Sequence, residues 1–377
     1  MTTIAKRMAL IEASGIRRIW QLAATMKDPV NFSIGEPDFA APEAVKREAI
    51  RAIESDRNNY TVTAGIPELR QVLAARVAAE FGWQEPAVLV TSGLSGALTL
   101  ALMAIVDAGD GVLLADPYFV SYKHLTVLQG GVCQFVDTYP DFALTAERLR
   151  SAVTKTSKVL VLNSPTNPTG RVIPVEQLQA IAQVAREAGL LVLSDEIYRD
   201  FSYDGPAESI ANYYENTLLL RGFSKTYGVP GWRLGYVAAP KALAGVIDAM
   251  TTLQQYTFVC APHPFQVAAL TALGCDTSAQ IAAYRRKRDL IYEGLKGPFE
   301  LHRPEGAFYA FVRAPGGRAT EFVERAIQRG VLVIPGSVFS QQDSHFRLSY
   351  ATGEAQIRRG IERLCALAGE IAGGRGN

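Results

Sequence analysis

The stretch KVLVLNSPTNPTGRVIPVEQLQAIAQVAREAGLLVLSDEIY, residues 158–198, contains two apolar runs separated by one amphipathic segment. The runs at 158–165 and 190–198 are continuous enough to predict strands that are covered on both faces. Residues 174–189, between them, begin with a proline and end with a glycine, which predicts a helix. A strand, a helix and a second strand in this order indicate a parallel α/β sheet.

The same kind of apolar run recurs through the middle of the chain. Further strands are predicted at 88–93, 111–117, 132–137, 217–224 and 233–240. The pattern predicts an α/β fold whose large domain, residues 41–275, has a mostly parallel seven-stranded sheet between helices. The regular alternation of apolar runs and amphipathic segments ends near residue 275, and the pattern of residues 276–377 predicts a smaller α+β domain. Residues 1–40 are expected to form an N-terminal arm and to complete part of that small domain.

The composition limits the classes of function. Of the 377 residues, 48% are hydrophobic, which is ample for buried cores in one large and one smaller domain. The net charge is only +1 and the charges are interspersed, so neither nucleic acid nor an anionic membrane is predicted as a partner. No apolar run reaches the roughly 20 residues that cross a bilayer, and no signal peptide is visible at the start. We therefore expect a cytoplasmic protein.

The four cysteines and four histidines are widely scattered. Cys133, Cys260, Cys275 and Cys365 form no CxxC pair, which favours reduced thiols over disulfides or a zinc site. No metal site is predicted.

Polar residues follow several predicted strands, at the edge where open α/β sheets build their sites. Lys225 lies in a Ser/Gly-rich turn directly after an apolar run. A lone lysine is usually a solvated surface group, but a desolvated amine at such a place can act as a nucleophile or form a Schiff base. Arg233, eight residues later, could hold an anion such as phosphate, and could equally cap a helix or pair with a carboxylate.

Two further strands end in polar residues of interest. Asp195 follows a six-residue apolar run, where a charge is costly without a cation, so we expect it to face a ligand cation rather than a structural salt bridge. Tyr198 could reach the same ligand. Asn167 lies in NPTG, which in isolation is typical of a turn, yet at the end of a buried strand its amide could donate to a ligand oxygen.

The stretch TSGLSGALTLALMAI, residues 91–105, leads from a strand into an apolar helix. Its backbone N–H groups and helix dipole suit an anion, although it is neither a P-loop nor a dinucleotide-binding fingerprint. One kind of cofactor would use all of these groups: the lysine amine, the aspartate, the asparagine and the anion site with its arginine. Pyridoxal phosphate has a carbonyl that forms imines, a protonated ring nitrogen, a phenolic oxygen and a phosphate.

The chain resembles the class I/II, fold-type I pyridoxal-phosphate-dependent aminotransferases along essentially its whole length. Eight stretches in the family's order carry the resemblance. They are GEPDF (35–39), YTVTAGIPELR (60–70), VTSGLSGAL (90–98), DPYFVSY (116–122), NSPTNPTG (163–170), SDEIY (194–198), FSKTYGVPGWRLGY (223–236) and FRLSYA (346–351).

The resemblance implies a role for each matching residue. Lys225 would form the internal aldimine and move the proton between Cα and C4′ of the cofactor in a ping-pong transamination. Asp195 would keep the pyridinium nitrogen protonated, which makes the ring an electron sink. Asn167 and Tyr198 would hydrogen-bond the phenolic oxygen, and Phe119 would stack on the ring. Lys225, Asp195 and Tyr198 are thus the expected catalytic residues.

The resemblance also implies a phosphate site and an assembly. The site would use the backbone amides of Leu94 and Ser95, the Arg233 guanidinium and the Ser224 hydroxyl. Many relatives have a serine three residues before the lysine, but this chain has Gly222, so one phosphate hydrogen bond is lost or replaced. Tyr60 matches a tyrosine that reaches the phosphate of the neighbouring subunit, which implies a homodimer with shared active sites.

For the substrate, the resemblance implies that Arg347 binds the α-carboxylate as a bidentate fork, with Asn167 and the Gly35 backbone beside it. Without that context, Arg347 would be interpreted as a surface residue of an edge strand. The 2-oxo acid acceptor is not specified.

The segment 251–262 has no Lys or Arg but contains the aromatic residues Tyr256 and Phe258. This favours neutral or aromatic amino donors over dicarboxylic ones. A cation from elsewhere, such as Arg17 or Arg18, would reverse that preference.

Two other functions fit parts of the pattern. A C–S β-lyase or related β/γ-elimination enzyme would keep Lys225 and Asp195, and would be distinguished by release of pyruvate and ammonia. A non-catalytic pyridoxal-phosphate-binding regulator would carry an added DNA-binding module, and only about 30 residues precede FSIGEPDF here.

Overall fold

The structure is a computed structural model and describes residues 3–13 and 15–373. Its large sheet has seven strands in the order β2-β8-β7-β6-β5-β3-β4. They are β2 (Ala87–Ser92), β3 (Gly111–Asp116), β4 (Val132–Asp137), β5 (Ser157–Asn163), β6 (Leu191–Asp195), β7 (Thr217–Gly222) and β8 (Leu234–Ala239). Strand β8 is antiparallel to both of its neighbours and the other pairs are parallel. The predicted mostly parallel, seven-stranded sheet is confirmed.

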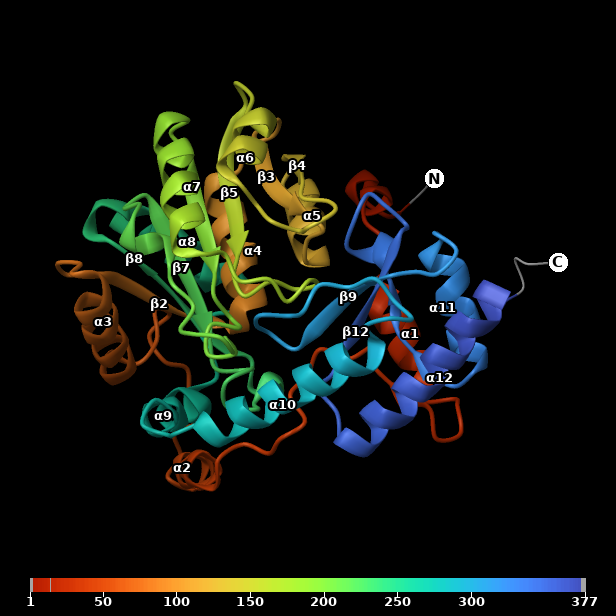
Figure 1. Cartoon of the computed structure of the whole chain (residues 1–377). Coiled ribbons are helices and arrows are strands. Elements are labelled where there is room, and N and C mark those ends of the chain that lie inside the picture. The colour runs from red at the N-terminus through yellow and green to blue at the C-terminus, as the bar shows by residue number, and fades with distance from the viewer. Residues whose placement is uncertain (1–2, 14, 374–377) are drawn as a thin grey trace.

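Helices cover both faces of this sheet (Figure 1). The helices of this domain are α2 (Glu43–Glu54), which packs on α9, and α3 (Pro67–Phe81), α4 (Gly93–Ile105), α5 (Val120–Leu128), α6 (Ala146–Ala152), α7 (Val175–Glu187), α8 (Ala244–Thr257) and α9 (His263–Ala272). Along β5, Val159 and Val161 pack in the cluster that contains α4 and α8, whereas Leu160 and Leu162 pack with α6 and α7. Alternate residues of one strand are therefore buried on opposite faces, which explains the continuous apolar runs.

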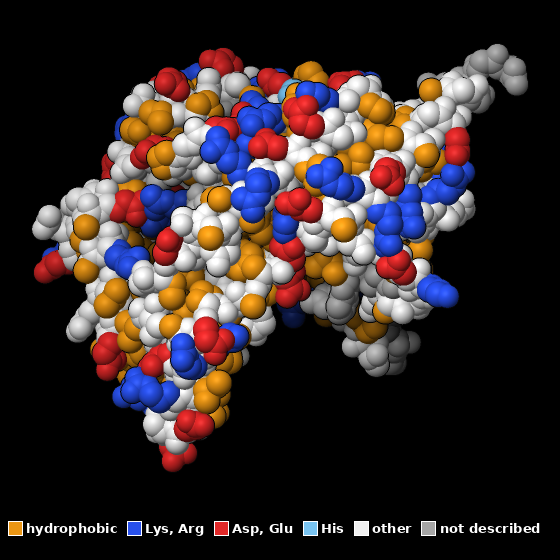
Figure 2. All heavy atoms as spheres, turned by 60° about the horizontal axis from the view of Figure 1, so that its bottom comes forward, with side chains coloured by type: hydrophobic (Ala, Val, Ile, Leu, Met, Phe, Trp, Pro, Cys, Tyr) orange, Lys and Arg blue, Asp and Glu red, His pale blue; other side chains and the backbone are white. Residues whose placement is uncertain are grey.

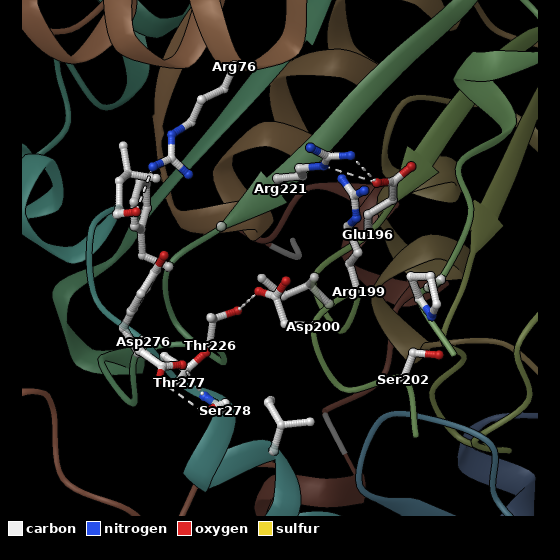
Figure 3. Close-up of a pocket in the computed structure, with 18 of the residues that line it drawn as sticks. Arg76, Glu196, Arg199, Asp200, Ser202, Arg221, Thr226, Asp276, Thr277 and Ser278 are labelled. Carbon is white, nitrogen blue, oxygen red and sulfur yellow. Dashed lines mark hydrogen bonds and ion pairs between the residues drawn. The ribbon is translucent and has the colours of Figure 1, made fainter. Parts of the chain in front are cut away.

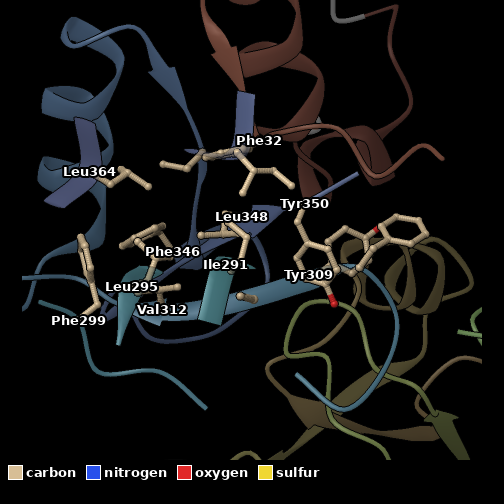
Figure 4. Close-up of a cluster of buried hydrophobic side chains, with 14 of the residues drawn as sticks. Phe32, Ile291, Leu295, Phe299, Tyr309, Val312, Phe346, Leu348, Tyr350 and Leu364 are labelled. Atoms are coloured by element: carbon tan, nitrogen blue, oxygen red, sulfur yellow. The ribbon is translucent and has the colours of Figure 1, made fainter. Parts of the chain in front are cut away.

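The smaller domain is built on a three-stranded antiparallel sheet in the order β11-β12-β9. Its strands are β9 (Tyr309–Arg313), β11 (Ile334–Pro335) and β12 (His345–Ser349), and its helices are α10 (Ser278–Leu295), α11 (Ala319–Gln328) and α12 (Glu354–Gly373). Figure 4 shows the buried cluster that joins them, with Ile291 and Leu295 of α10, Leu364 of α12 and Phe346 of β12. Short 3-10 helices lie at Lys6–Leu10, Ile210–Asn212, Pro230–Trp232, Lys241–Leu243 and Gly336–Val338.

The N-terminal segment joins this smaller domain. Strand β1 (Val30–Asn31) pairs in parallel with β10 (Val331–Leu332), and helix α1 (Gly15–Ala23) lies beside the same region (Figure 1). The limits of the domains at residues 40 and 275 stay predictions.

The surface and the cysteines agree with the composition. On the face shown in Figure 2, basic and acidic side chains are interspersed. The four cysteines are free thiols. Within the described residues, no helix has the length and hydrophobicity to span a bilayer.

The burial of the central strand β6 leads to a stability prediction. Leu193 is fully buried in β6, so Leu193→Ala should lower the free energy of unfolding by about 3 kcal/mol through lost apolar contact and a residual cavity. Val132, on edge strand β4, is 51% exposed, and Val132→Ala should cost less than about 0.5 kcal/mol. Urea unfolding measures both, and equal losses would contradict the assigned burial of β6.

Candidate active site

The predicted site residues gather in one cavity of about 240 Å³ between the carboxyl edge of the large sheet and the small domain. Every residue predicted to be catalytic, cofactor-binding or substrate-binding lines it, except Tyr60. Those lining it are Gly35, Leu94, Ser95, Phe119, Asn167, Asp195, Tyr198, Ser224, Lys225, Arg233 and Arg347. Their convergence from distant segments makes this cavity the candidate active site.

Lys225 lies in the turn that follows β7, and its Nζ donates a hydrogen bond to the Gly35 carbonyl at 2.7 Å. Burial lowers the pKa of Lys225 to about 8. Glu36 and Asp195 oppose this change, whereas the positive charges of Arg233 and Arg347 add to it. The amine is therefore much closer to its neutral, nucleophilic form near neutral pH than an exposed lysine is.

Asp195 ends strand β6 and is buried. Its Oδ2 accepts a hydrogen bond from the Tyr122 hydroxyl at 2.6 Å, and its Oδ1 accepts one from the Ile197 N–H at 3.2 Å. Burial raises the pKa of Asp195 to about 6, and these two hydrogen bonds oppose the rise. Among the described residues no lysine or arginine forms an ion pair with it, so the structural salt bridge considered above is absent there.

Arg347 is a fully buried cation. Its Nη1 donates to Asn167 Oδ1 at 3.0 Å and its Nη2 to the Ser33 carbonyl at 2.8 Å, while its buried Nε has no partner in the described part of the chain. The rings of Tyr309 and Phe339 lie 4.6 and 4.5 Å from the guanidinium carbon. No carboxylate of the described residues pairs with it. A buried guanidinium held only by dipoles and π faces suits an anionic ligand.

The interpretation of Arg347 as a surface residue of an edge strand is wrong. Strand β12 is the middle strand of the small sheet, and the side chain of Arg347 is 1% exposed.

The opposite end of the cavity is suited to a phosphate. Helix α4 begins at Gly93, and the N–H groups of its first turn, which include those of Leu94 and Ser95, have no partner within the helix. A Cβ on Gly93 would lie 2.7 Å from Arg233 Nη2, so only glycine lets the guanidinium approach this helix end. Arg233 donates to the Pro230 carbonyl at 3.0 Å and has no carboxylate partner among the described residues.

Gly222, at the end of β7, lies close to Ile197. A Cβ at this position would lie 2.9 Å from Cδ1 of Ile197. A serine at this position would therefore require the Ile197 side chain to shift.

Tyr60 lies outside the cavity and is 80% exposed. Tyr256 and Phe258, at the end of α8, are exposed as well. The side chains of Arg17 and Arg18 lie outside the described residues.

Six residues of the cavity were not predicted: Ile16, Leu98, Tyr122, Asn163, Ile197 and Tyr309. Tyr122 had a usable signal, since it follows Phe119 by three residues and a helix brings such positions to one face. Tyr309 sits in the apolar run GAFYAF, which indicates only a buried strand.

A larger cleft, of about 1170 Å³, lies between α3, the start of α10 and the segments after β6 and β7 (Figure 3). Its charges largely satisfy one another, because Arg221 pairs with Glu80 at 2.6 Å and with Glu196 at 2.8 Å, and Arg199 also pairs with Glu80. Neither Lys225 nor Arg347 lines it. We therefore place the chemistry in the smaller cavity.

The lowered pKa of Lys225 can be measured directly. In cofactor-free protein, the rate at which acetic anhydride acetylates Lys225 should rise with pH up to about 8 and then level off, because only the neutral amine reacts. Lys241 is the internal control, since its hydrogen bond to Glu85 raises its pKa and its rate should still rise at pH 10. Peptide mass spectrometry follows both lysines, and parallel profiles would contradict the assignment.

Comparison with known proteins agrees with this geometry. Residues 27–364 match the family model "Aminotransferase class I and II". The chain is 35% identical to a probable aspartate aminotransferase of Methanocaldococcus jannaschii, over 95% of this chain and 98% of that relative. It is 33% identical to aromatic-amino-acid aminotransferase 2 of Thermococcus litoralis, over 96% and 97% of the two chains.

Among solved structures, the aspartate aminotransferase from Thermus thermophilus with maleate superimposes with a TM-score of 0.92. The two chains are 36% identical, and the match covers 97% of this chain and 100% of the other. The chain therefore belongs to the class I and II aminotransferases, a family of pyridoxal-phosphate-dependent transaminases of fold type I.

Proposed function

We propose that this enzyme moves the amino group of a neutral or aromatic L-amino acid to a 2-oxo acid by a ping-pong mechanism, with pyridoxal phosphate in the Lys225 cavity. The observation that carries the proposal is the set of three charges on one small cavity. The cavity is lined by Lys225, Asp195 and Arg347. The pKa of Lys225 is lowered, and among the described residues Asp195 forms no ion pair and Arg347 has no carboxylate partner.

The residues present fit the cofactor. The close approach of Arg233 to Gly93 makes an anion cradle at the start of α4, which Leu94, Ser95 and Ser224 would complete around the phosphate. Asp195 would hold the ring nitrogen, Asn167 and Tyr198 the phenolic oxygen, and Phe119 the face of the ring. Bound there, pyridoxal phosphate supplies an electrophilic carbonyl and an electron-accepting ring.

Lys225 is the only lysine that lines the described cavity, and we assign to it both the covalent attachment and the movement of the proton at the substrate Cα. Its lowered pKa allows it to accept and return a proton near neutral pH. Asp195 would keep a proton on the ring nitrogen. Its buried carboxylate forms no ion pair with a described residue, so the protonated ring would balance its charge.

Arg347 would orient the substrate through the α-carboxylate. Its Nε has no partner in the described part of the chain, and Asn167 and the Gly35 backbone lie at the same wall. A bidentate pair fixes both position and orientation, which brings Cα towards Lys225.

Three cations line the described cavity, and the proposal gives each a role at the lysine, the phosphate or the α-carboxylate. The remaining described lining includes Ile16, Phe119 and Tyr309. No further described cation is present for a second substrate carboxylate, which supports neutral or aromatic donors.

We also propose a homodimer with shared active sites in the cytoplasm. Five exposed apolar side chains support the dimer: Tyr60, Val62, Tyr256, Phe258 and Val259. The two segments that carry them are adjacent, since Gln254 donates to the Thr63 carbonyl at 2.7 Å. Such a patch suits an isologous interface, through which Tyr60 of the partner subunit would reach the phosphate.

The absorbance spectrum tests the reaction. The purified enzyme should show a visible band from the Lys225-bound cofactor, and single amino acids without an acceptor should convert it to the near-ultraviolet band of the aminated cofactor. Lys225→Ala should bind the cofactor without a covalent bond and lose turnover.

The control donors are aspartate and glutamate, which should convert the band more slowly than phenylalanine or leucine. A visible band that persists while pyruvate and ammonia are released would indicate a lyase instead. Near-normal turnover by Lys225→Ala would refute the role of Lys225.

Removal of the Arg347 guanidinium tests the substrate site. Arg347→Ala should raise the KM for amino donors by up to about 100-fold, or roughly 3 kcal/mol, with a smaller effect on kcat. Arg313→Ala is the matched control, because Arg313 lies on the adjacent strand β9 but is exposed and pairs with Glu300 at 3.1 Å. Steady-state kinetics with the best donor measure both variants, and a similar KM change in both would contradict the assignment.

A further inference from the structure

Tyr309 is a cavity residue whose position the proposed function leaves unexplained. It begins strand β9, its side chain is 1% exposed, and it belongs to the buried cluster of the small domain. Figure 4 shows it at the edge of that cluster. The ring is thus fixed by the small domain while the hydroxyl reaches the cavity.

The hydroxyl of Tyr309 meets the hydroxyl of Tyr198 at 2.8 Å, with the two rings nearly perpendicular at 89°. Burial raises the pKa of both, so both keep their protons. Only one proton can lie between the two oxygens, and the other hydroxyl keeps its proton for a different acceptor. Either hydroxyl can be the donor of this bond. When Tyr309 donates, Tyr198 keeps its own proton available.

The ring of Tyr309 has a second contact. Its ring centre lies 4.6 Å from the Arg347 guanidinium carbon, and the ring centre of Phe339 lies 4.5 Å from it. Because Arg347 Nε has no partner among the described residues, these two rings are its main support besides Asn167 and Ser33.

The backbone beside Tyr309 is adapted to its hydroxyl. A Cβ built on Gly35 would collide with the Tyr309 oxygen, so the chain can pass here only as glycine. The carbonyl of this same glycine accepts the hydrogen bond from Lys225 Nζ. Tyr309 therefore contacts Tyr198 and Arg347 directly. It also contacts Gly35, whose carbonyl binds Lys225.

We propose that Tyr309 is a positioning residue with two separable functions. Its hydroxyl donates to Tyr198, which leaves the Tyr198 proton free for the phenolic oxygen of the cofactor. Its ring holds the Arg347 guanidinium in the orientation that binds the substrate carboxylate. This inference rests on the proposed function of the cavity.

The hydroxyl is tested on the holoenzyme without substrate, by titrating the visible absorbance of the Lys225-bound cofactor against pH. A hydrogen bond from Tyr198 stabilises negative charge on the phenolic oxygen and so lowers the pKa of the adjacent protonated nitrogen. Tyr309→Phe weakens that bond and should raise this pKa by about 0.5 to 1. In the Tyr198→Phe background, the same substitution should add almost nothing.

The ring is tested by kinetics with the best amino donor. Tyr309→Phe keeps the ring over Arg347 and should change the KM less than about 2-fold, whereas Tyr309→Leu removes it and should raise the KM about 10-fold or more. Tyr350→Phe is the matched control, since its buried hydroxyl donates to the Ala307 carbonyl at 3.2 Å in the same domain. Its titration and its KM should match the wild-type values.

A Tyr309→Phe titration that overlays the wild type, or an equal shift with Tyr198→Phe present, would overturn the role of the hydroxyl. Equal KM values for the Phe and Leu variants would overturn the role of the ring. If Tyr309→Phe does not fold, the Tyr309→Leu variant also lacks the hydroxyl and should raise the same pKa, and an unchanged titration would again overturn the inference. Failure of the wild type to form the visible band would contradict the proposed function, which separates the two failures.

Discussion

The hydrogen bond of 3.0 Å between Arg347 and Asn167 joins the two sheets of this protein. Arg347 comes from the middle strand of the small sheet, and Asn167 from the loop after β5 of the large sheet. A guanidinium this deeply buried needs hydrogen-bond acceptors for its N–H groups, and no carboxylate of the described residues supplies one. The two domains therefore meet around the Arg347 guanidinium, which has no anionic partner among the described residues. The cavity lies where such an anion would bind.

The other charges follow from the same arrangement. Parallel strands place Asp195 and the Lys225 turn at one edge of the large sheet, and α4 adds an anion-binding helix end. Three cations then face one cavity, and their mutual repulsion together with burial keeps the Lys225 amine reactive. In an apolar interior without ligand such a grouping would be unfavourable, so the site is electrostatically matched to a ligand that carries several negative charges.

The sequence predicted the large sheet closely, because strands buried on both faces appear as uninterrupted apolar runs whose ends differ from the observed strands by at most three residues. Polar residues directly after such runs led to Lys225, Asp195 and Asn167. It did not predict what depends on packing across the molecule. The order of the small strands, which makes β12 central, and the close approach of Ile197 to Gly222 both depend on tertiary packing. Tyr309 was hidden because a strand residue whose ring is in the core and whose hydroxyl is in a cavity has no distinct local pattern.

In the proposed dimer, both chains would contribute to the choice of amino donor. The described cavity has a carboxylate site in Arg347 and an anion site near Arg233, and both are occupied in the proposed complex. Discrimination among donors must come from the wall that contacts the side chain of the substrate. Ile16 lines the cavity, and the proposed dimer would add residues of a second copy to it. A single chain thus provides the chemistry, whereas the assembled dimer would complete the specificity.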